Sequence, residues 1–270
     1  QRLTLDNQRF IGNVGWRQNE QTYDALSIRH QLNPATSLQY AWLDKVHRVF
    51  GNQHPNPLQA EQDLDAHLFN LGWKGAPGSF TGYAYLIENQ DLPATSTRSL
   101  GLRHQRSLPS SEGREWWYAG EYARQQGWRD APSNGSVDYF NLELGLRASG
   151  HGLRIGHERL GSNGRRAFQT PLATAHAFNG WADRFLATPA NGLSDLHIKF
   201  DGPLGPTRYL LALHRFEAAR GGADYGDEFN AQLSWAFAKG WNALVKYADY
   251  RSDGFGSDVR KLWMSLEYRY

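Results

Sequence analysis

The residues most able to do chemistry in this sequence are charged side chains that recur at alternate positions of several segments. In an extended strand, every second side chain points to the same face. One face would then carry Arg2, Arg29, Arg103, Arg147, Arg154, Lys199, Lys246 and Arg269, together with Asp6, Glu121, Glu143, Glu158 and Glu267. A planar guanidinium can bind a carboxylate through two hydrogen bonds and is weakly hydrated, so rings of arginine favour anions. The pattern predicts a pore lining that binds or conducts anions, although the same charges could also form a rigid lattice of ion pairs.

Strands with one apolar face and one charged face are the elements that must hold these residues. Residues 227–238 and 262–270 show the alternation most clearly. We expect Phe229, Leu233, Trp235, Leu262, Leu266 and Tyr268 to face outward, and Asn230, Gln232, Glu267 and Arg269 to face inward. Such strands suit a boundary between lipid and a watery lumen.

Tight and long connections alternate along the chain, except that residues 107–113 form a connection of middling length where the pattern expects a tight turn. Tight turns are expected near residues 33–35, 76–78, 149–152, 202–205 and 238–240, and longer linkers at 7–21, 50–64, 89–96, 125–136, 161–193, 218–225 and 251–258. Short turns on one side and long loops on the other are typical of bacterial outer-membrane barrels. We therefore predict an all-β fold, a closed antiparallel transmembrane barrel of about 14 strands that begins with a strand at residues 1–5. It would form a single domain over residues 1–270.

The composition agrees with a barrel and excludes other classes. Mean hydropathy is −0.65, and no apolar run reaches the ~18 residues of a membrane-spanning helix. Aromatic residues make up 13% of the chain, which suits interfacial girdles but could also be the core of a soluble β-protein. The net charge of +2 argues against nucleic-acid binding. The absence of cysteine excludes disulfides and thiolate metal sites. No secretion signal opens the sequence, so we expect a mature or truncated chain.

The longest connection, residues 161–193, is too apolar for a freely solvated loop. Phe168 and Trp181 stand in it beside Asp183 and Arg184, and these are its candidate functional residues. A short helix is expected over residues 174–187. Because long loops without a strand pattern are often functional, we expect this one to fold over or into the pore.

Catalytic and metal-binding motifs are absent, so we predict no catalytic residue, no metal site and no cofactor. The sequence contains neither a Gly-x-Ser-x-Gly nor a His-Glu-x-x-His motif. A histidine and a serine from separate strands could still form a lipid-facing hydrolase site, and a non-conducting structural barrel is a further alternative. The acidic groups Asp63/Asp65 and Asp224/Asp227/Glu228 could bind calcium, but solvated loop charge explains them as well.

Several segments resemble the alginate-export family of outer-membrane barrels. They are DNQRFIGNVGWRQNEQT (residues 6–22), AFQTPLAT (167–174), FNGWAD (178–183), KYADY (246–250) and KLW (261–263). The resemblance implies a monomeric channel in the outer membrane of a Gram-negative bacterium. Its solute would be anionic: an acidic polysaccharide such as alginate, other uronates, or carboxylates. Members usually carry further strands before the first of these motifs, so more strands are expected in the full-length protein.

The last strand is expected to direct assembly. Leu266, Tyr268 and Tyr270 form an apolar stripe that ends in an aromatic residue. We expect the barrel-assembly machinery to recognise this stripe during insertion into outer-membrane lipid, and the strand itself to pair with the first one. The sequence leaves the solute and the direction of transport open.

Overall fold

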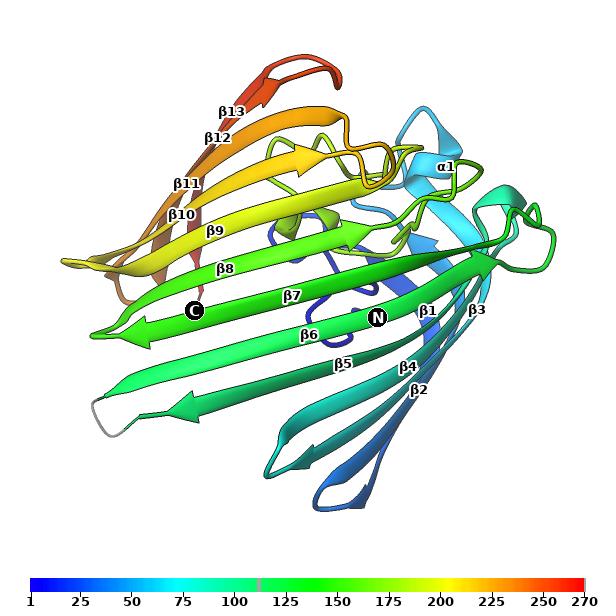
Figure 1. The fold of residues 1–270 in the computed structure, drawn as a ribbon, viewed down its shortest axis with the longest axis horizontal. Helices are drawn as coiled ribbons and strands as arrows, with labels where there is room; N and C mark the ends of the chain where they lie inside the picture. Colours follow the sequence, from blue (N-terminus) through cyan, green and yellow to red (C-terminus); the bar gives the residue numbers. More distant parts are fainter. Residues whose placement is uncertain (111–112, 270) are drawn as a thin grey trace.

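A single curved antiparallel sheet of 13 strands forms the molecule, and each strand pairs with the next one along the chain (Figure 1). The computed structural model describes residues 1–110 and 113–269. The strands are β1 (Thr22–Asn33), β2 (Thr36–His47), β3 (Glu61–Gly75), β4 (Gly78–Asn89), β5 (Thr97–Pro109), β6 (Arg114–Gly127), β7 (Ser136–Ala148), β8 (His151–Leu160), β9 (Leu193–Leu204), β10 (Thr207–Glu217), β11 (Asp224–Ala238), β12 (Trp241–Ser252) and β13 (Val259–Tyr268). The predicted all-β antiparallel architecture is confirmed.

The connections alternate in length as predicted, with short turns at one end of the strands and long loops at the other (Figure 1). Ser149 and Gly150 alone join β7 to β8, with φ angles of 51° and 82°. Two-residue hairpin turns of type I′ need positive φ at both positions because this backbone twist matches that of the flanking strands. Successive hairpins thereby place every long loop at the same end of the strands.

The two faces of the sheet differ in polarity in the predicted register. Phe229, Leu233, Trp235, Leu262, Leu266 and Tyr268 are all exposed, between 39% and 62%. On the opposite face of β11, Asn230 is fully buried. Large apolar side chains are also exposed on many other strands, for example Leu26, Leu100 and Leu144. An apolar outer surface of this kind is what contact with lipid requires.

The predicted strand at residues 1–5 is wrong, so the described sheet has fewer strands than predicted. Leu3 and Leu5 are buried in the interior cluster rather than placed on an outer face. In so short a segment, two leucines two positions apart fit a strand and an irregular buried segment equally well. The predicted pairing of the last strand with the first is not found either, because β13 and β1 are unpaired with each other. Tyr270, the end of the predicted assembly stripe, lies outside the described residues.

The helical segments are short: α1 (Pro57–Ala60), η1 (Pro93–Thr95) and η2 (Ala175–Ala177). The helix predicted over residues 174–187 is therefore wrong beyond one turn. Asn179, Gly180 and Asp183 have positive φ angles, which a right-handed helix excludes. Among the described residues, none of the helices has the length and apolar character needed to span a membrane.

Two irregular segments, residues 1–21 and 161–192, lie on the concave side of the sheet (Figure 1). We call them together the luminal constriction. Phe10 from the first segment packs on Phe168 from the second, with ring centroids 5.7 Å apart, and on Tyr139 of β7 at 5.3 Å. These rings belong to one buried cluster near the long-loop end of the strands. The constriction thus fills the concave side of the sheet at that end.

Candidate functional site

Backbone hydrogen bonds join the two halves of the luminal constriction. The Gly12 N–H donates to the Leu172 carbonyl at 2.9 Å, and the Thr174 N–H donates to the Gln8 carbonyl at 3.1 Å. A Cβ on Gly12 would lie 2.1 Å from the Thr174 hydroxyl oxygen, so only glycine permits this approach. The two long motifs noted in the sequence are therefore partners in a single folded unit.

A buried ion pair anchors the constriction to β8. Arg9 donates from Nε and Nη2 to the two Glu158 oxygens at 2.5 and 3.1 Å. The Tyr139 hydroxyl donates to the same carboxylate at 2.7 Å, and the Asn179 amide donates to it at 2.6 Å. A buried ion pair is stable only when its remaining hydrogen-bonding capacity is used in this way. The alternation predicted the inward position of Glu158, but Arg9 lies in an irregular segment where no alternation could mark it.

Lys246 of β12 is enclosed by tryptophan rings. Its Nζ lies 4.0 Å from the centroid of the Trp181 ring, 5.1 Å from that of Trp16 and 5.8 Å from that of Trp263. An ammonium over aromatic faces is held by cation–π attraction. The side chain was predicted to line the pore, but it is buried and instead ties both halves of the constriction to the sheet.

His176 links this lysine to Asp183. Lys246 Nζ lies 2.8 Å from His176 Nε2, and His176 Nδ1 lies 2.6 Å from Asp183 Oδ1. Because an ammonium can only donate, Nε2 accepts and the histidine proton resides on Nδ1, which leaves the ring neutral. Burial lowers the pKa of His176, the bond to Asp183 opposes this, and the charge of Lys246 adds to it. Burial opposes a low pKa for Asp183, but bonds from His176 and Lys261 hold it below its usual value.

Basic side chains line a cavity of about 330 Å³ beside the constriction. Arg103, Arg154 and Lys199 contribute to its wall, together with the carboxylates of Glu143, Glu158 and Asp195. Arg154 and Lys199 stand directly opposite each other on β8 and β9. Like charges in directly opposite positions repel, and within the described residues neither forms an ion pair with a carboxylate. The Arg154 guanidinium packs 4.9 Å from the Trp117 ring centroid, and its buried Nε has no hydrogen-bond partner.

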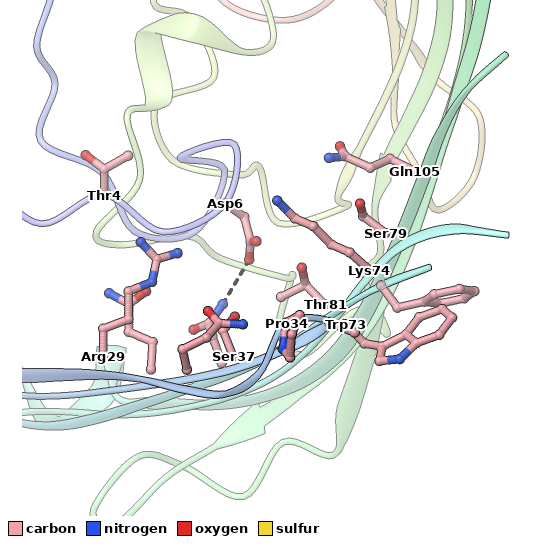
Figure 2. A pocket seen from close by; sticks show the side chains of 16 residues that line it. Thr4, Asp6, Arg29, Pro34, Ser37, Trp73, Lys74, Ser79, Thr81 and Gln105 are labelled. Atoms are coloured by element: carbon pink, nitrogen blue, oxygen red, sulfur yellow. Dashed lines mark hydrogen bonds between the residues drawn. The ribbon is translucent and has the colours of Figure 1, made fainter. Parts of the chain in front are cut away.

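A larger polar cavity of about 660 Å³ lies toward the short turns. Figure 2 shows Arg29 and Lys74 extending into it from the strands, on either side of Asp6 of the constriction. Asp6 accepts a hydrogen bond from Asn70 at 2.9 Å. Lys74 was not predicted, because it lies next to the turn between β3 and β4, where the alternation ends.

Several of the predicted pore residues form ion pairs. Arg2 pairs with Glu20 at 2.9 Å, Arg103 with Glu121 at 3.0 Å, Arg147 with Asp201 at 3.4 Å and Arg269 with Glu267 at 2.7 Å. Glu121 is almost fully buried and also accepts a hydrogen bond from the Tyr83 hydroxyl. The ion-pair lattice thus describes these residues, of which Arg103 also borders the smaller cavity, while Arg29, Arg154, Lys199 and Glu143 face the cavities.

The four loop residues singled out in the sequence all lie inside the constriction. Phe168 is fully buried. The Trp181 ring contacts Lys246, and Asp183 is hydrogen-bonded to His176. The Arg184 guanidinium lies 5.7 Å from the Tyr250 ring centroid. These contacts assign the residues to fixing the shape of the constriction.

The acidic groups considered for calcium do not come together. Asp63 pairs with Lys45 at 2.9 Å, and Asp224 pairs with Arg215 at 3.2 Å. Glu228 is buried and accepts the Ala182 N–H at 2.7 Å. These carboxylates therefore act as separate structural acceptors.

One histidine–serine contact lies on the outer face of the sheet. His157 Nε2 is 2.9 Å from Ser194 Oγ, between β8 and β9. In the described part of the chain, no acidic or amide side chain bonds the other ring nitrogen. A catalytic histidine normally has such an orienting partner, so the contact does not amount to a hydrolase site.

Asp195, His197 and His214 form a further buried cluster that the sequence analysis did not single out. Asp195 and His197 share the inner face of β9 with Lys199, because they occupy alternate positions of one strand. The alternation of side chains that assigned Lys199 to the inner face could thus also have assigned Asp195 and His197 to it. His214 is opposite His197 on β10, and only the register of the two strands reveals this.

Comparison with known proteins identifies the fold. No family model and no curated protein matches the chain. OccK9 (OpdG) of Pseudomonas aeruginosa has a TM-score of 0.73 at 13% identity, covering 98% of this chain and 70% of that one. OccK3 (OpdO) of the same organism has a TM-score of 0.72 at 16% identity, covering 99% and 74%. OccAB4 of Acinetobacter baumannii has a TM-score of 0.68 at 15% identity, covering 93% and 66%.

These neighbours are Gram-negative outer-membrane porins of the Occ/OprD type. At such low identity the likeness establishes the fold, which is that of OprD-type barrels. The neighbours are channels and not enzymes.

The resemblance to the alginate-export family is wrong, because the structural neighbours are Occ/OprD porins. The two longest motifs behind it fall in the luminal constriction, where the Gly12–Leu172 and Thr174–Gln8 contacts fix their residues. Packing between two irregular segments can demand glycines and small polar residues whatever solute passes. The motifs therefore indicate the packing of the constriction and do not identify a substrate.

Proposed function

We propose that this protein is an outer-membrane channel for small solutes that carry carboxylates. The observation that carries the proposal is the pair Arg154 and Lys199, which face one cavity from directly opposite positions. The charge of Glu143 offsets part of the repulsion between these two cations, and a solute carboxylate between them would relieve more of it. The fold shared with the Occ/OprD porins supports a channel as the class of protein.

A basic route can be followed through the two cavities. Arg29 and Lys74 provide positive charge in the larger cavity, and Arg103 follows with Arg154 and Lys199 in the smaller one. The paired Arg103 keeps donors for a passing carboxylate, because Glu121 takes only one of its guanidinium nitrogens within 3.0 Å. A solute would thus pass from one set of hydrogen-bond donors to the next, and its affinity for each set would be low enough for release.

The constriction favours small solutes over a polymer. Its two segments are joined by backbone hydrogen bonds and a buried aromatic cluster, so it has the character of a folded core. The basic cavity beside it has a volume of about 330 Å³, at the lower end of the ~300–1,000 Å³ of small-molecule sites. Passage of a chain such as alginate would require this core to open.

We further propose that the sheet is part of a closed barrel in the membrane, as a monomer surrounded by lipid. Unpaired backbone groups cost several kcal/mol each in hydrocarbon, so the free edges of β1 and β13 need partner strands. Hydrogen exchange in lipid vesicles provides the measurement. Amides along both edges should be protected, and rapid exchange there would contradict closure.

Single-channel recording in planar bilayers tests the proposed function. In a salt gradient, the reversal potential should indicate anion preference, and Arg154→Gln combined with Lys199→Gln should shift it toward cations. The shift should be larger near 0.1 M salt than near 1 M, where the Debye length falls from about 10 Å to about 3 Å. Arg98→Gln with Arg124→Gln is the matched control, because it removes the same charge from the outer face.

Each other outcome of this experiment rejects part of the proposal. An unchanged reversal potential in the Arg154/Lys199 variant would mean that these two side chains do not set the selectivity and that the protein is a general pore. An equal shift in the control would mean that net charge, and not the pathway, sets selectivity. Absence of conductance in folded protein would favour the structural barrel.

A further inference from the structure

The inner faces of β9 and β10 bring two imidazoles and a carboxylate together. Asp195 and His197 occupy alternate positions of β9, and His214 is the direct cross-strand partner of His197. Residues at alternate positions of one strand, and directly opposite on the next, share a face with Cβ atoms about 5 Å apart. One donor atom from each side chain lies within 4.8 Å of the other two.

Hydrogen bonds leave part of this cluster unsatisfied. Asp195 Oδ1 is 2.9 Å from His214 Nδ1 and 3.7 Å from His197 Nδ1. His197 is only 5% exposed, yet neither of its ring nitrogens has a hydrogen-bond partner. Buried polar groups in folded proteins are almost always paired, and an exception calls for an explanation such as an ion.

We propose that Asp195, His197 and His214 bind a divalent transition-metal ion such as Zn²⁺. Imidazole and carboxylate donors suit this class of metal. Zinc ligands lie about 2.0–2.2 Å from the ion, so neighbouring donors in a tetrahedral site are about 3.3 Å apart. The separations of 2.9 and 3.7 Å fall on either side of that value. Small side-chain rotations would complete the geometry.

The surroundings support the ligands. Asp195 Oδ2 accepts a hydrogen bond from Asn179 of the constriction at 3.1 Å, and His214 Nδ1 lies 2.9 Å from Oδ1 and 3.0 Å from Oδ2, so an ion bound to Oδ1 and His214 would replace the proton that now lies between them. His197 Nε2 lies 3.6 Å from Glu143 Oε1. A carboxylate behind a ligating histidine fixes its tautomer and raises its basicity. Glu143 is therefore a positioning residue for the proposed site.

The fourth coordination position faces the basic cavity. Asp195 and His197 both belong to the wall of the 330 Å³ space, so an ion can reach the cluster from the pathway, and water can complete its coordination. Through the Asn179 bond, occupancy would also stiffen the constriction. The site does not depend on the identity of the solute, so it stands apart from the proposed channel function.

Metal titration tests the proposal. Untagged, detergent-folded protein is first freed of metal with a chelator and then titrated. Calorimetry with Zn²⁺ should give one site per chain. His197→Gln and His214→Gln should each weaken binding by more than the about 10- to 100-fold known for outer-shell changes, and Glu143→Gln should fall within that range. His157→Gln is the matched control, since His157 lies on the outer face of β8. Heat-modifiable electrophoretic migration verifies the folding of every variant.

Cobalt spectroscopy of the wild-type protein keeps the test decisive should a variant fail to fold. Substituted Co²⁺ should give the intense visible absorption of a four- or five-coordinate site, and X-ray absorption should count two imidazole nitrogens. Three results would each overturn the proposal: no binding of metal by the wild type, a coordination shell of oxygens alone, or binding by the His197 and His214 variants that is as tight as that of the wild type. Conductance that continues without metal would leave the channel function intact.

Discussion

Lys246 and Lys199 face the same side of the sheet but differ in what surrounds them. Lys246 is enclosed by Trp16, Trp181 and Trp263, whereas Lys199 borders an open cavity beside Arg154. Alternation along a strand assigns each side chain to a face. Whether its charge is available to a solute depends on residues from distant segments, and no local pattern contains that information.

The buried Arg9–Glu158 pair should dominate the stability of the constriction. Arg9→Ala leaves the Glu158 carboxylate buried without its counter-ion, which costs about 3–5 kcal/mol. Urea denaturation of the refolded protein measures this loss as a fall in the free energy of unfolding. Arg2→Ala is the control: its pair with Glu20 is exposed, and such pairs contribute at most about 1 kcal/mol. Equal effects would show that Arg9 is no more important than a surface arginine.

Gly12 should not tolerate a side chain. Gly12→Ala would bring a Cβ to within 2.1 Å of the Thr174 hydroxyl oxygen and force the two halves of the constriction apart. We expect higher single-channel conductance and faster proteolysis within residues 161–192. Gly120→Ala makes the same change on β6, where nothing lies within 4 Å of the new Cβ. Wild-type behaviour of Gly12→Ala would mean that the constriction adjusts at this point.

At the scale of elements, the β8–β9 loop should undock in acid. Burial lowers the pKa of His176 below its ordinary value of 6.5. The undocked loop, where the ordinary value applies, binds the proton more tightly, so docking is strongest above pH 6.5 and weakens as the pH falls below it. Protonation would also place the imidazolium beside Lys246, with Arg17 and Lys261 nearby and only Asp183 in compensation.

Proteolysis of the loop between pH 8 and pH 5 measures this effect. Cleavage within residues 161–192 should accelerate as the pH falls, after correction for the protease itself. The His176 ring stacks on that of Trp16, with centroids 3.7 Å apart. His176→Phe keeps a ring in this place but cannot take a proton, so its cleavage should not change with pH. His54→Phe, in an exposed loop, should behave as the wild type. A pH response retained by His176→Phe would assign the effect to another group.

The strands could be predicted from sequence, and the irregular segments could not. Alternation of Phe229 and Leu233 with Asn230 fixes a register because a slip by one residue would reverse every side chain. Residues 1–5 and 174–187 carry weak local patterns, and their conformation is set by contacts with the sheet. The same limit applies to the site: Arg154 and Lys199 were predicted by parity, while Arg9 and the cross-strand partner His214 required the three-dimensional structure.

At the scale of the whole molecule, the final strand should govern insertion. Leu266 and Tyr268 are exposed on the outer face, and Tyr270→Ser would remove the aromatic end of their stripe. We expect less folded protein in the outer membrane, measured as heat-modifiable, protease-resistant barrel. Tyr122→Ser removes an exposed tyrosine from the outer face of β6 and should leave the yield unchanged. Equal yields of both variants would place the assembly signal elsewhere.

The separation in sequence between the two halves of the constriction sets an order of events during folding. Every strand pairs with its immediate neighbour, whereas the contact between Arg9 and Thr170 spans 161 positions. Closing loops of that length is entropically costly, so long-range contacts form slowly compared with hairpins. A newly inserted molecule should therefore pass through a wide-bore stage, in which the wall is complete and the opening is not yet narrowed. In the proposed channel, permeability to solutes should be higher during that interval than after the constriction has formed.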